Sequence, residues 1–225
     1  MTMPDAVSVV SSDVQEESFQ CFRFFDLPPE LRMKIYDDIL HVDQVVDINF
    51  KAQKRLNMFL VSKRFSSEAA RSFFGGNRFR LLPTHHNAVA RWAQPIIRRL
   101  SAFHRSCLTS VELRVGPFWT QPPMCWRVDD TLGLEDASGI RFLRVFVQCD
   151  PSHPMYQDWR ISTTFFTDFC AGLLKETVRR LPNLVHVQFD NYSGVDRDGP
   201  LLRSLLREAS AGGKKISWGC EGMNV

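Results

Sequence analysis

The chain has 225 residues, of which 44% are hydrophobic, and its formal net charge at pH 7 is +3. This length and composition allow one or two globular domains with a substantial buried core. No run of apolar residues approaches the roughly 20 that a membrane-spanning helix requires, so we expect no membrane partner. Residues 1–20 lack the charged and apolar regions of a secretory signal peptide, and we expect them to form a disordered tail.

The stretch FRFFDLPPELRMKIYDDIL, residues 22–40, predicts a short amphipathic helix that begins at a double proline. Proline is tolerated in the first turn of a helix, because the amides there have no intrahelical acceptor. Leu31, Ile35 and Ile39 recur at four-residue spacing and predict one apolar stripe. The polar residues of the helix are then expected to face water: Arg32, Lys34, Asp37 and Asp38.

The stretch LNMFLVSKRFSSEAARSFF, residues 56–74, is the predicted packing partner of the first helix. Gly75, Gly76 and Asn77 supply the signal that ends this second helical segment. Its inner face is expected to carry these residues: Leu56, Phe59, Leu60, Ala69, Phe73 and Phe74.

Together, LPPELRMKIYDDIL and LVSKRF resemble the two halves of an F-box, in the form common among filamentous-fungal proteins. The resemblance implies a partner, a Skp-family adaptor within a cullin complex. The residues that it places in the adaptor contact are Leu27, Pro28, Leu31, Ile35, Ile39, Leu40, Leu60, Val61 and Phe65. The alternative is that the same residues pack into a core of their own, since periodic apolar stripes usually do.

Between the two halves, the segment HVDQVVDINF (residues 41–50) alternates apolar and polar residues at Val46, Ile48 and Phe50. This period predicts a strand and not a tight loop between helices. A strand here favours one domain in which the N-terminal helices join a later sheet.

Charge is distributed unevenly along the chain. Residues 1–50 carry 3 basic and 10 acidic side chains (−7), residues 51–114 carry 13 and 2 (+11), and residues 115–225 carry 12 and 13 (−1). A basic block attracts nucleic acid or acidic protein surfaces. It can also be the solvated face of a helix, or be neutralised by the acidic N-terminal part. No nucleic-acid module accompanies the charge, so we do not expect nucleic acid as a partner.

Beyond residue 78 the pattern predicts a small sheet with packed helices, of the α+β or α/β class. The predicted helices lie near residues 85–105, 161–180 and 199–210. The predicted strands are residues 79–82, 108–115, 140–149, 184–189 and 215–220. LPNLVHVQFDN (residues 181–191) resembles one leucine-rich repeat, but the strand spacing is irregular. We therefore predict a weakly repeat-like or compact α/β domain.

Residues 116–139 show no structural pattern, and long loops in compact domains tend to be functional or disordered. Phe118, Trp119 and Trp126 give this loop the composition of a contact surface. We predict that these three residues bind the target protein. The alternative is that their rings cap the sheet.

No catalytic motif is present in the sequence, so we predict a protein that is not an enzyme and needs no cofactor or metal. The six cysteines are scattered without a C-x-x-C pair, which indicates reduced thiols and a cytoplasmic or nuclear location.

The predicted organisation is a tail at 1–20, an F-box-like segment at 21–80 and an α/β target-binding domain at 81–225. The function that it implies is a substrate receptor, which links a target protein to a Skp/cullin ubiquitin ligase. The alternative is a non-enzymatic interaction protein in which the F-box-like helices are only a structural cap.

Overall fold

The computed structural model describes residues 22–46, 57–81, 84–85, 96–116, 126–150, 154, 157 and 162–219. The predicted tail at 1–20 lies outside these ranges. The described chain begins with a short 3₁₀ turn, η1 (Phe24–Asp26), and the helix α1 (Pro29–Leu40). A second 3₁₀ turn, η2 (Asn57–Leu60), precedes the helix α3 (Lys63–Gly76). The double proline and the Gly-Gly-Asn signal therefore predicted a helix start and a helix end correctly.

The helices α1 and α3 pack side by side and run in the same direction, because their contacts follow one another in the same order along both helices. Glu68 contacts Arg32, Ser72 Oγ donates to Asp37 Oδ1 at 2.6 Å, and Asn77 Oδ1 accepts from the Val42 amide at 2.7 Å. The Asn77 side chain also donates to the carbonyl oxygens of Leu40 and Phe73, each at 2.9 Å. One amide side chain thus satisfies backbone groups at the C-terminal ends of both helices.

Five parallel strands form the central sheet, and their order in the sheet is their order in the chain. They are β1 (Arg78–Leu81), β3 (Ser110–Val115), β5 (Phe142–Val147), β6 (His186–Asn191) and β7 (Lys215–Trp218). All five predicted strands are present, with ends that differ by a few residues. With six α-helices among the described residues, the fold belongs to the α/β class.

Two of the predicted helical regions are single helices, α6 (Phe165–Arg180) and α7 (Pro200–Ala211). The single helix predicted near 85–105 is wrong. Its start lies in a strand, β2 (Thr84–His85), which pairs with β4 (Trp126–Arg127). Its end is divided into α4 (Ile96–Arg99) and α5 (Ala102–Cys107), because Ser101 caps a new helix by accepting a hydrogen bond from the His104 amide at 3.2 Å.

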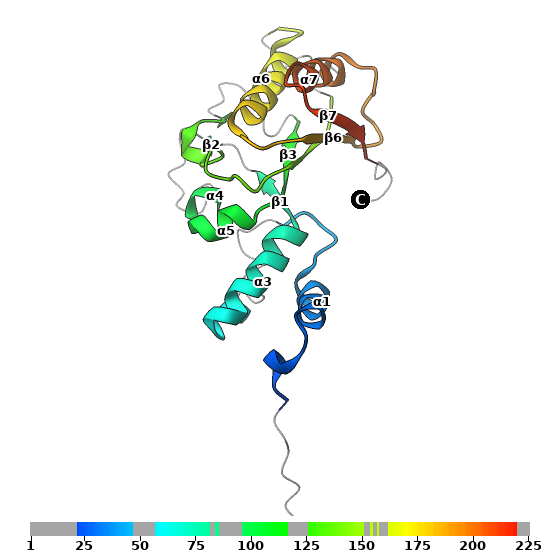
Figure 1. Cartoon of the computed structure of the whole chain (residues 1–225). Coiled ribbons are helices and arrows are strands. Elements are labelled where there is room, and N and C mark those ends of the chain that lie inside the picture. Colours follow the sequence, from blue (N-terminus) through cyan, green and yellow to red (C-terminus); the bar gives the residue numbers. More distant parts are fainter. Residues whose placement is uncertain are drawn as a thin grey trace, which may run out of the picture.

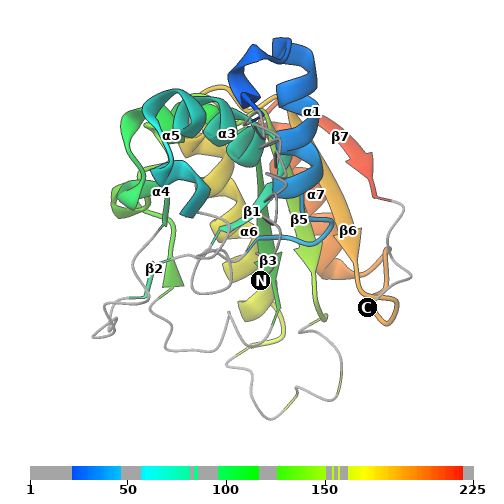
Figure 2. The ribbon, with the colours of Figure 1, turned by 90° about the horizontal axis from the view of Figure 1, so that it is seen from below.

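The helices α6 and α7 cover one face of the sheet, and α1 and α3 lie at the end of the sheet where β1 is the edge strand (Figures 1 and 2). Right-handed crossovers between parallel strands in chain order place their connecting helices on one face. That face supplies the aliphatic core, for example Leu113, Val145 and Val187. On the opposite face, charged side chains are buried as ion pairs: Arg144 pairs with Glu112, 3.4 Å apart, and with Asp190. Pairing is what makes the burial of these charges tolerable.

The helix pair and the sheet share one hydrophobic core. The rings of Phe73 and Phe74 contact the ring of Phe79 in β1, with centroids 5.4 and 5.5 Å apart. Val46 forms a parallel bridge with Phe79, the only part of the predicted 45–50 strand that pairs within the described residues. The predicted boundary between residues 80 and 81 falls inside β1. No helix in the described ranges is long and apolar enough to cross a membrane.

We expect Gly139→Ala to lower the free energy of unfolding by about 1–3 kcal/mol, the usual cost of overpacking. A Cβ atom there would lie 2.2 Å from the Ser106 carbonyl oxygen and 2.4 Å from that of Leu108. Gly172→Ala is the matched control: a Cβ atom would meet nothing within 4 Å in helix α6, so we expect stabilisation by about 0.4–1 kcal/mol. Urea unfolding of both variants measures the difference, and equal changes would contradict this packing.

Candidate functional site

Arg32 lies in the interface between α1 and α3, with only 5% of its side chain exposed. Its guanidinium group binds Glu68 through two hydrogen bonds of 2.9 Å, from Nε to Oε2 and from Nη2 to Oε1. A third hydrogen bond runs from Nη1 to the Leu27 carbonyl oxygen. The prediction that Arg32 faces water is therefore wrong, because a bidentate carboxylate partner on α3 holds it inside.

Tyr36 lies one turn further along α1 and is fully buried among aromatic rings. The rings of Phe24 and Phe65 lie 5.4 and 5.0 Å from the Tyr36 ring, centroid to centroid. Its hydroxyl donates to Glu68 Oε2 at 3.4 Å, and burial raises the pKa of Tyr36 to about 12. This cluster fixes η1 against the first turns of both helices.

Because Arg32 and Tyr36 face inward, the predicted apolar stripe of α1 faces outward. Leu31 is 49% exposed and Ile39 is 45% exposed, while Ile35 is half-buried. We predicted that this stripe would face the second helical segment, and the rotation of α1 contradicts that. Leu60, which we placed on the inner face of the second segment, is 83% exposed, and the adjacent Val61 is 69% exposed.

The nine residues of the predicted adaptor contact therefore differ in exposure. Leu40 is fully buried in the core and presents no side-chain surface to a partner. Leu27, Ile35 and Phe65 are half-buried. The exposed members are Pro28, Leu31, Ile39, Leu60 and Val61. We call Leu31, Ile35, Ile39, Leu60 and Val61 the outer apolar residues.

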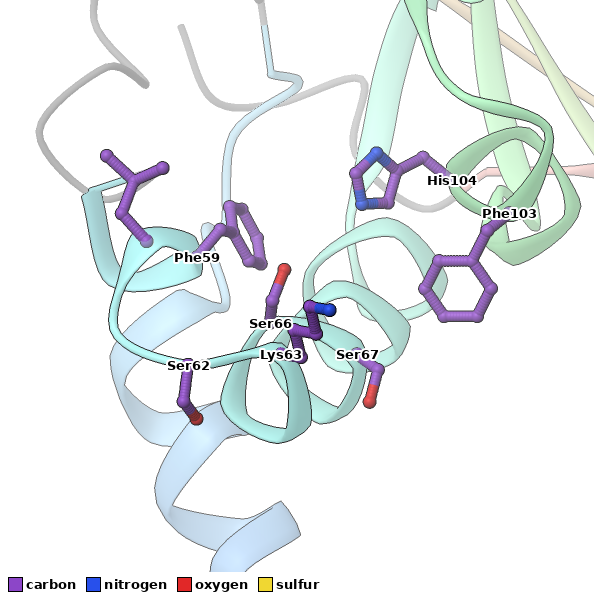
Figure 3. A pocket seen from close by; sticks show the side chains of 8 residues that line it. Phe59, Ser62, Lys63, Ser66, Ser67, Phe103 and His104 are labelled. Atoms are coloured by element: carbon purple, nitrogen blue, oxygen red, sulfur yellow. The ribbon is translucent and has the colours of Figure 1, made fainter.

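A pocket of about 520 Å³ lies beside α3, between η2 and α5 (Figure 3). At 100° per residue, Ser67 in its wall lies about half a turn from Phe65, which packs against α1. The pocket and α1 therefore lie on opposite sides of α3. We call it the α3–α5 pocket. It is lined by Phe59, Leu60, Ser62, Lys63, Ser66, Ser67, Phe103 and His104.

Aromatic stacking holds α5 against α3 at this pocket. The His104 ring lies 5.1 Å from the Phe74 ring and 6.3 Å from the Phe59 ring, centroid to centroid. Burial lowers the pKa of His104, so its imidazole is neutral at pH 7. The sequence prediction missed this pocket, because its walls come from segments about 40 residues apart in the chain.

Several exposed cations of α3 and α4 have no carboxylate partner in the described part of the chain. Between residues 51 and 114 the only acids are Glu68 and Glu112. Glu68 is paired with Arg32 and Arg64, and Glu112 with Arg114 and Arg144. Neither acid pairs with the exposed cations of this region: Lys63, Arg71, Arg98 and Arg99. These four described cations therefore display positive charge at the surface.

Two of the three predicted target-binding residues lie outside the described residues. Phe118 and Trp119 are outside the described residues, and Trp126 is described only by its backbone, in β4. The prediction that 116–139 lacks structure is wrong for its second half. There, η5 (Asp130–Leu132) follows β4, and Leu132 and Leu134 are fully buried.

No group of three or more His, Cys, Asp or Glu side chains that could hold a metal ion occurs in the described ranges. Comparisons of the chain with known protein families, curated proteins and solved structures found no match.

We expect Glu68→Gln to lower the urea midpoint at pH 7, because it leaves the Arg32 charge without its carboxylate. The hydrogen bond from Arg32 holds the pKa of Glu68 below its ordinary value. Such a carboxyl stabilises the fold above its unfolded pKa, and this stability is lost as the pH falls through the folded pKa. The difference from wild type should therefore shrink below about pH 4.

The control for this experiment is Asp38→Asn, an exposed carboxylate on α1. We expect it to leave the urea midpoint nearly unchanged at pH 7 and at pH 3. A Glu68→Gln effect that is equal at pH 7 and pH 3 would show that the carboxylate charge does not hold α1 on α3.

Proposed function

We propose that this protein is an F-box-like substrate receptor that links a target protein to a Skp/cullin ubiquitin ligase. In this proposal the α1–α3 pair docks on a Skp-family adaptor, and the sheet with its connections presents the target. The observation that supports it most is the exposure of four outer apolar residues on the two segments that resemble an F-box: Leu31, Ile39, Leu60 and Val61.

The fold leaves two large apolar side chains of α1, Leu31 and Ile39, partly in water. Fully burying a Leu or Ile side chain contributes about 1.5–3 kcal/mol to stability. Leu31 and Ile39 are only partly buried, so the fold of this chain does not gain the full contribution from them. A helical partner surface that covered both residues would gain the rest of this burial free energy. Phe22, Leu60 and Val61 are also exposed, so large exposed apolar side chains concentrate in the F-box-like part of the described chain.

The packing of the helix pair supports a preformed docking surface. The bidentate Arg32–Glu68 contact and the Asn77 hydrogen bonds fix α1 on α3 without a partner. A surface that is ordered before binding loses less conformational entropy on association. The proposed adaptor would therefore meet a rigid pair and not a folding segment.

We propose further that the C-terminal part is a degenerate array of leucine-rich-repeat-like units. Parallel strands in chain order, with their connecting helices on one face, are compatible with such an array. The inward positions of the segment 181–191 are also buried: Leu181, Leu184, Val187 and Phe189. In this proposal Phe118, Trp119 and Trp126 contribute to the target contact.

The proposed receptor performs no chemistry of its own. It holds a target lysine near a ubiquitin-conjugating enzyme and so raises the effective concentration of the two reactants. This requires two separate surfaces on one rigid body. The helix pair and the sheet share a core, which is consistent with that requirement.

The second candidate function is an interaction protein in which the helix pair only caps the sheet. The bridge between Val46 and Phe79 and the continuous core favour it, because they join the F-box-like segment to the sheet as one unit. The two candidates differ in what the outer apolar residues contact.

We expect the wild-type protein to co-purify with a Skp-family adaptor, and the double variant Leu31→Lys with Ile39→Lys to lose at least tenfold in recovered adaptor. Each substitution places a charge where an apolar contact is proposed, and every 1.4 kcal/mol lost is about a factor of ten in affinity. Quantitative pull-down with purified adaptor measures the loss.

The matched control is Val185→Lys with Tyr192→Lys, two residues of similar exposure in the sheet part of the chain (57% and 52%). We expect this variant to bind the adaptor as wild type does, and thermal unfolding checks that both variants fold. If wild type recovers no adaptor, or if both variants bind equally well, the receptor function is refuted and the cap remains.

A further inference from the structure

We propose that the α3–α5 pocket binds an acidic segment of this chain's own N-terminus, residues 13–19 with the sequence DVQEESF. This segment lies outside the described residues. The contact does not depend on the proposed function, although its consequence for adaptor binding does.

The charges of the pocket and the segment are complementary. Lys63 lines the pocket, and Arg71 lies one turn beyond Ser67 on the same helix, with its guanidinium 5.8 Å from the centre of the Phe103 ring. Neither cation forms an ion pair with a described carboxylate. Residues 1–21 contain four acids, Asp5, Asp13, Glu16 and Glu17, and no Lys or Arg. An unpaired cationic surface therefore lies on the same molecule as a segment of pure negative charge.

The pocket also has an apolar wall, which can bind an aromatic side chain of the segment in addition to its charges. Phe59, Leu60 and Phe103 line it, and Phe103 remains 38% exposed. Its volume of about 520 Å³ is within the range of ligand pockets, roughly 300–1,000 Å³. Phe19 lies two residues after Glu17, so the segment carries an aromatic anchor close to its carboxylates.

The described chain begins close enough for this contact. The Arg64 guanidinium lies 4.6 Å from the centre of the Phe25 ring, so η1 sits at the first turn of α3, where Ser62 and Lys63 enter the pocket wall. Glu17 and Glu16 are five and six residues before Phe22 and can reach about 17–21 Å from it. Half the circumference of a helix about 10 Å wide is roughly 16 Å, so Glu16 and Glu17 can reach the pocket side of α3.

Occupation of the pocket by residues 13–19 would cover Leu60, one of the outer apolar residues. If the proposed function holds, the N-terminal segment and the adaptor compete for this residue. The acidic segment would then act as a built-in inhibitor of adaptor binding, and its release would expose the site.

Zero-length carbodiimide cross-linking of the full chain tests the contact, because this reagent joins a carboxylate to a lysine amine only where they touch. We expect a link from Glu16 or Glu17 to Lys63, identified by mass spectrometry. The link should fall at least about fivefold between roughly 0.05 and 0.5 M salt, since salt screens exposed charges. Phe19→Ala should lower it severalfold, and Asp5→Asn should not.

Lys34 serves as an internal control, because it is exposed on α1, on the other side of α3 from the pocket. A merely tethered segment would link to Lys34 as readily as to Lys63, and that result would overturn the proposal. A link formed only between isotopically distinct copies would assign the pocket to a second copy. The variant Leu31→Lys with Ile39→Lys should keep the link to Lys63, so failure of this contact and failure of the adaptor proposal are distinguishable.

Discussion

The buried guanidinium group of Arg32 sets the rotation of α1, and the surface of the helix pair depends on that rotation. A guanidinium inside a protein must have its donors satisfied, and here Glu68 and the Leu27 carbonyl oxygen satisfy them. No carboxylate other than Glu68 contacts Arg32 among the described residues, so a rotation of α1 that turned Arg32 to water would break this pair and leave Glu68 with only the exposed Arg64. With Arg32, Tyr36 and Leu40 inside, Leu31 and Ile39 must lie outside. The apolar surface is therefore a consequence of one polar contact.

Because Glu68 is engaged by Arg32, it does not neutralise the cations on the other side of α3. Residues 51–114 contain only two acids, and both are engaged in ion pairs with arginines, Glu68 in the helix interface and Glu112 on the sheet. The exposed cations Lys63 and Arg71 are left without a described carboxylate. The helix pair thus presents apolar side chains on α1 and positive charge beside the α3–α5 pocket. These two surfaces suit partners of different chemistry, which is why we assign them different occupants.

Local sequence signals predicted the elements well but not their orientation. Alternating aliphatic residues predicted all five strands, because each strand buries one face against helices. Pro28 with Pro29, and Gly75 to Asn77, marked helix ends through backbone chemistry that needs no tertiary contact. The predicted rotation of α1 was wrong. The four-residue spacing of the Leu31 stripe is visible locally, whereas Glu68, the partner that holds Arg32 inside, is 36 residues away in the chain. The α3–α5 pocket was missed for the same reason, since Phe59 and His104 meet only in the folded chain.

Chemical modification of introduced cysteines measures the orientation of α1 most directly. The variants Leu31→Cys, Ile39→Cys and Leu40→Cys would each be treated with iodoacetamide in the folded state, and the labelled peptides counted by mass spectrometry. The account predicts that the first two react at nearly the rate of the unfolded chain, and that the cysteine at position 40 is protected by about a hundredfold or more. Equal protection at positions 31 and 40 would contradict it, because α1 would then bury its apolar stripe and leave no surface for a partner.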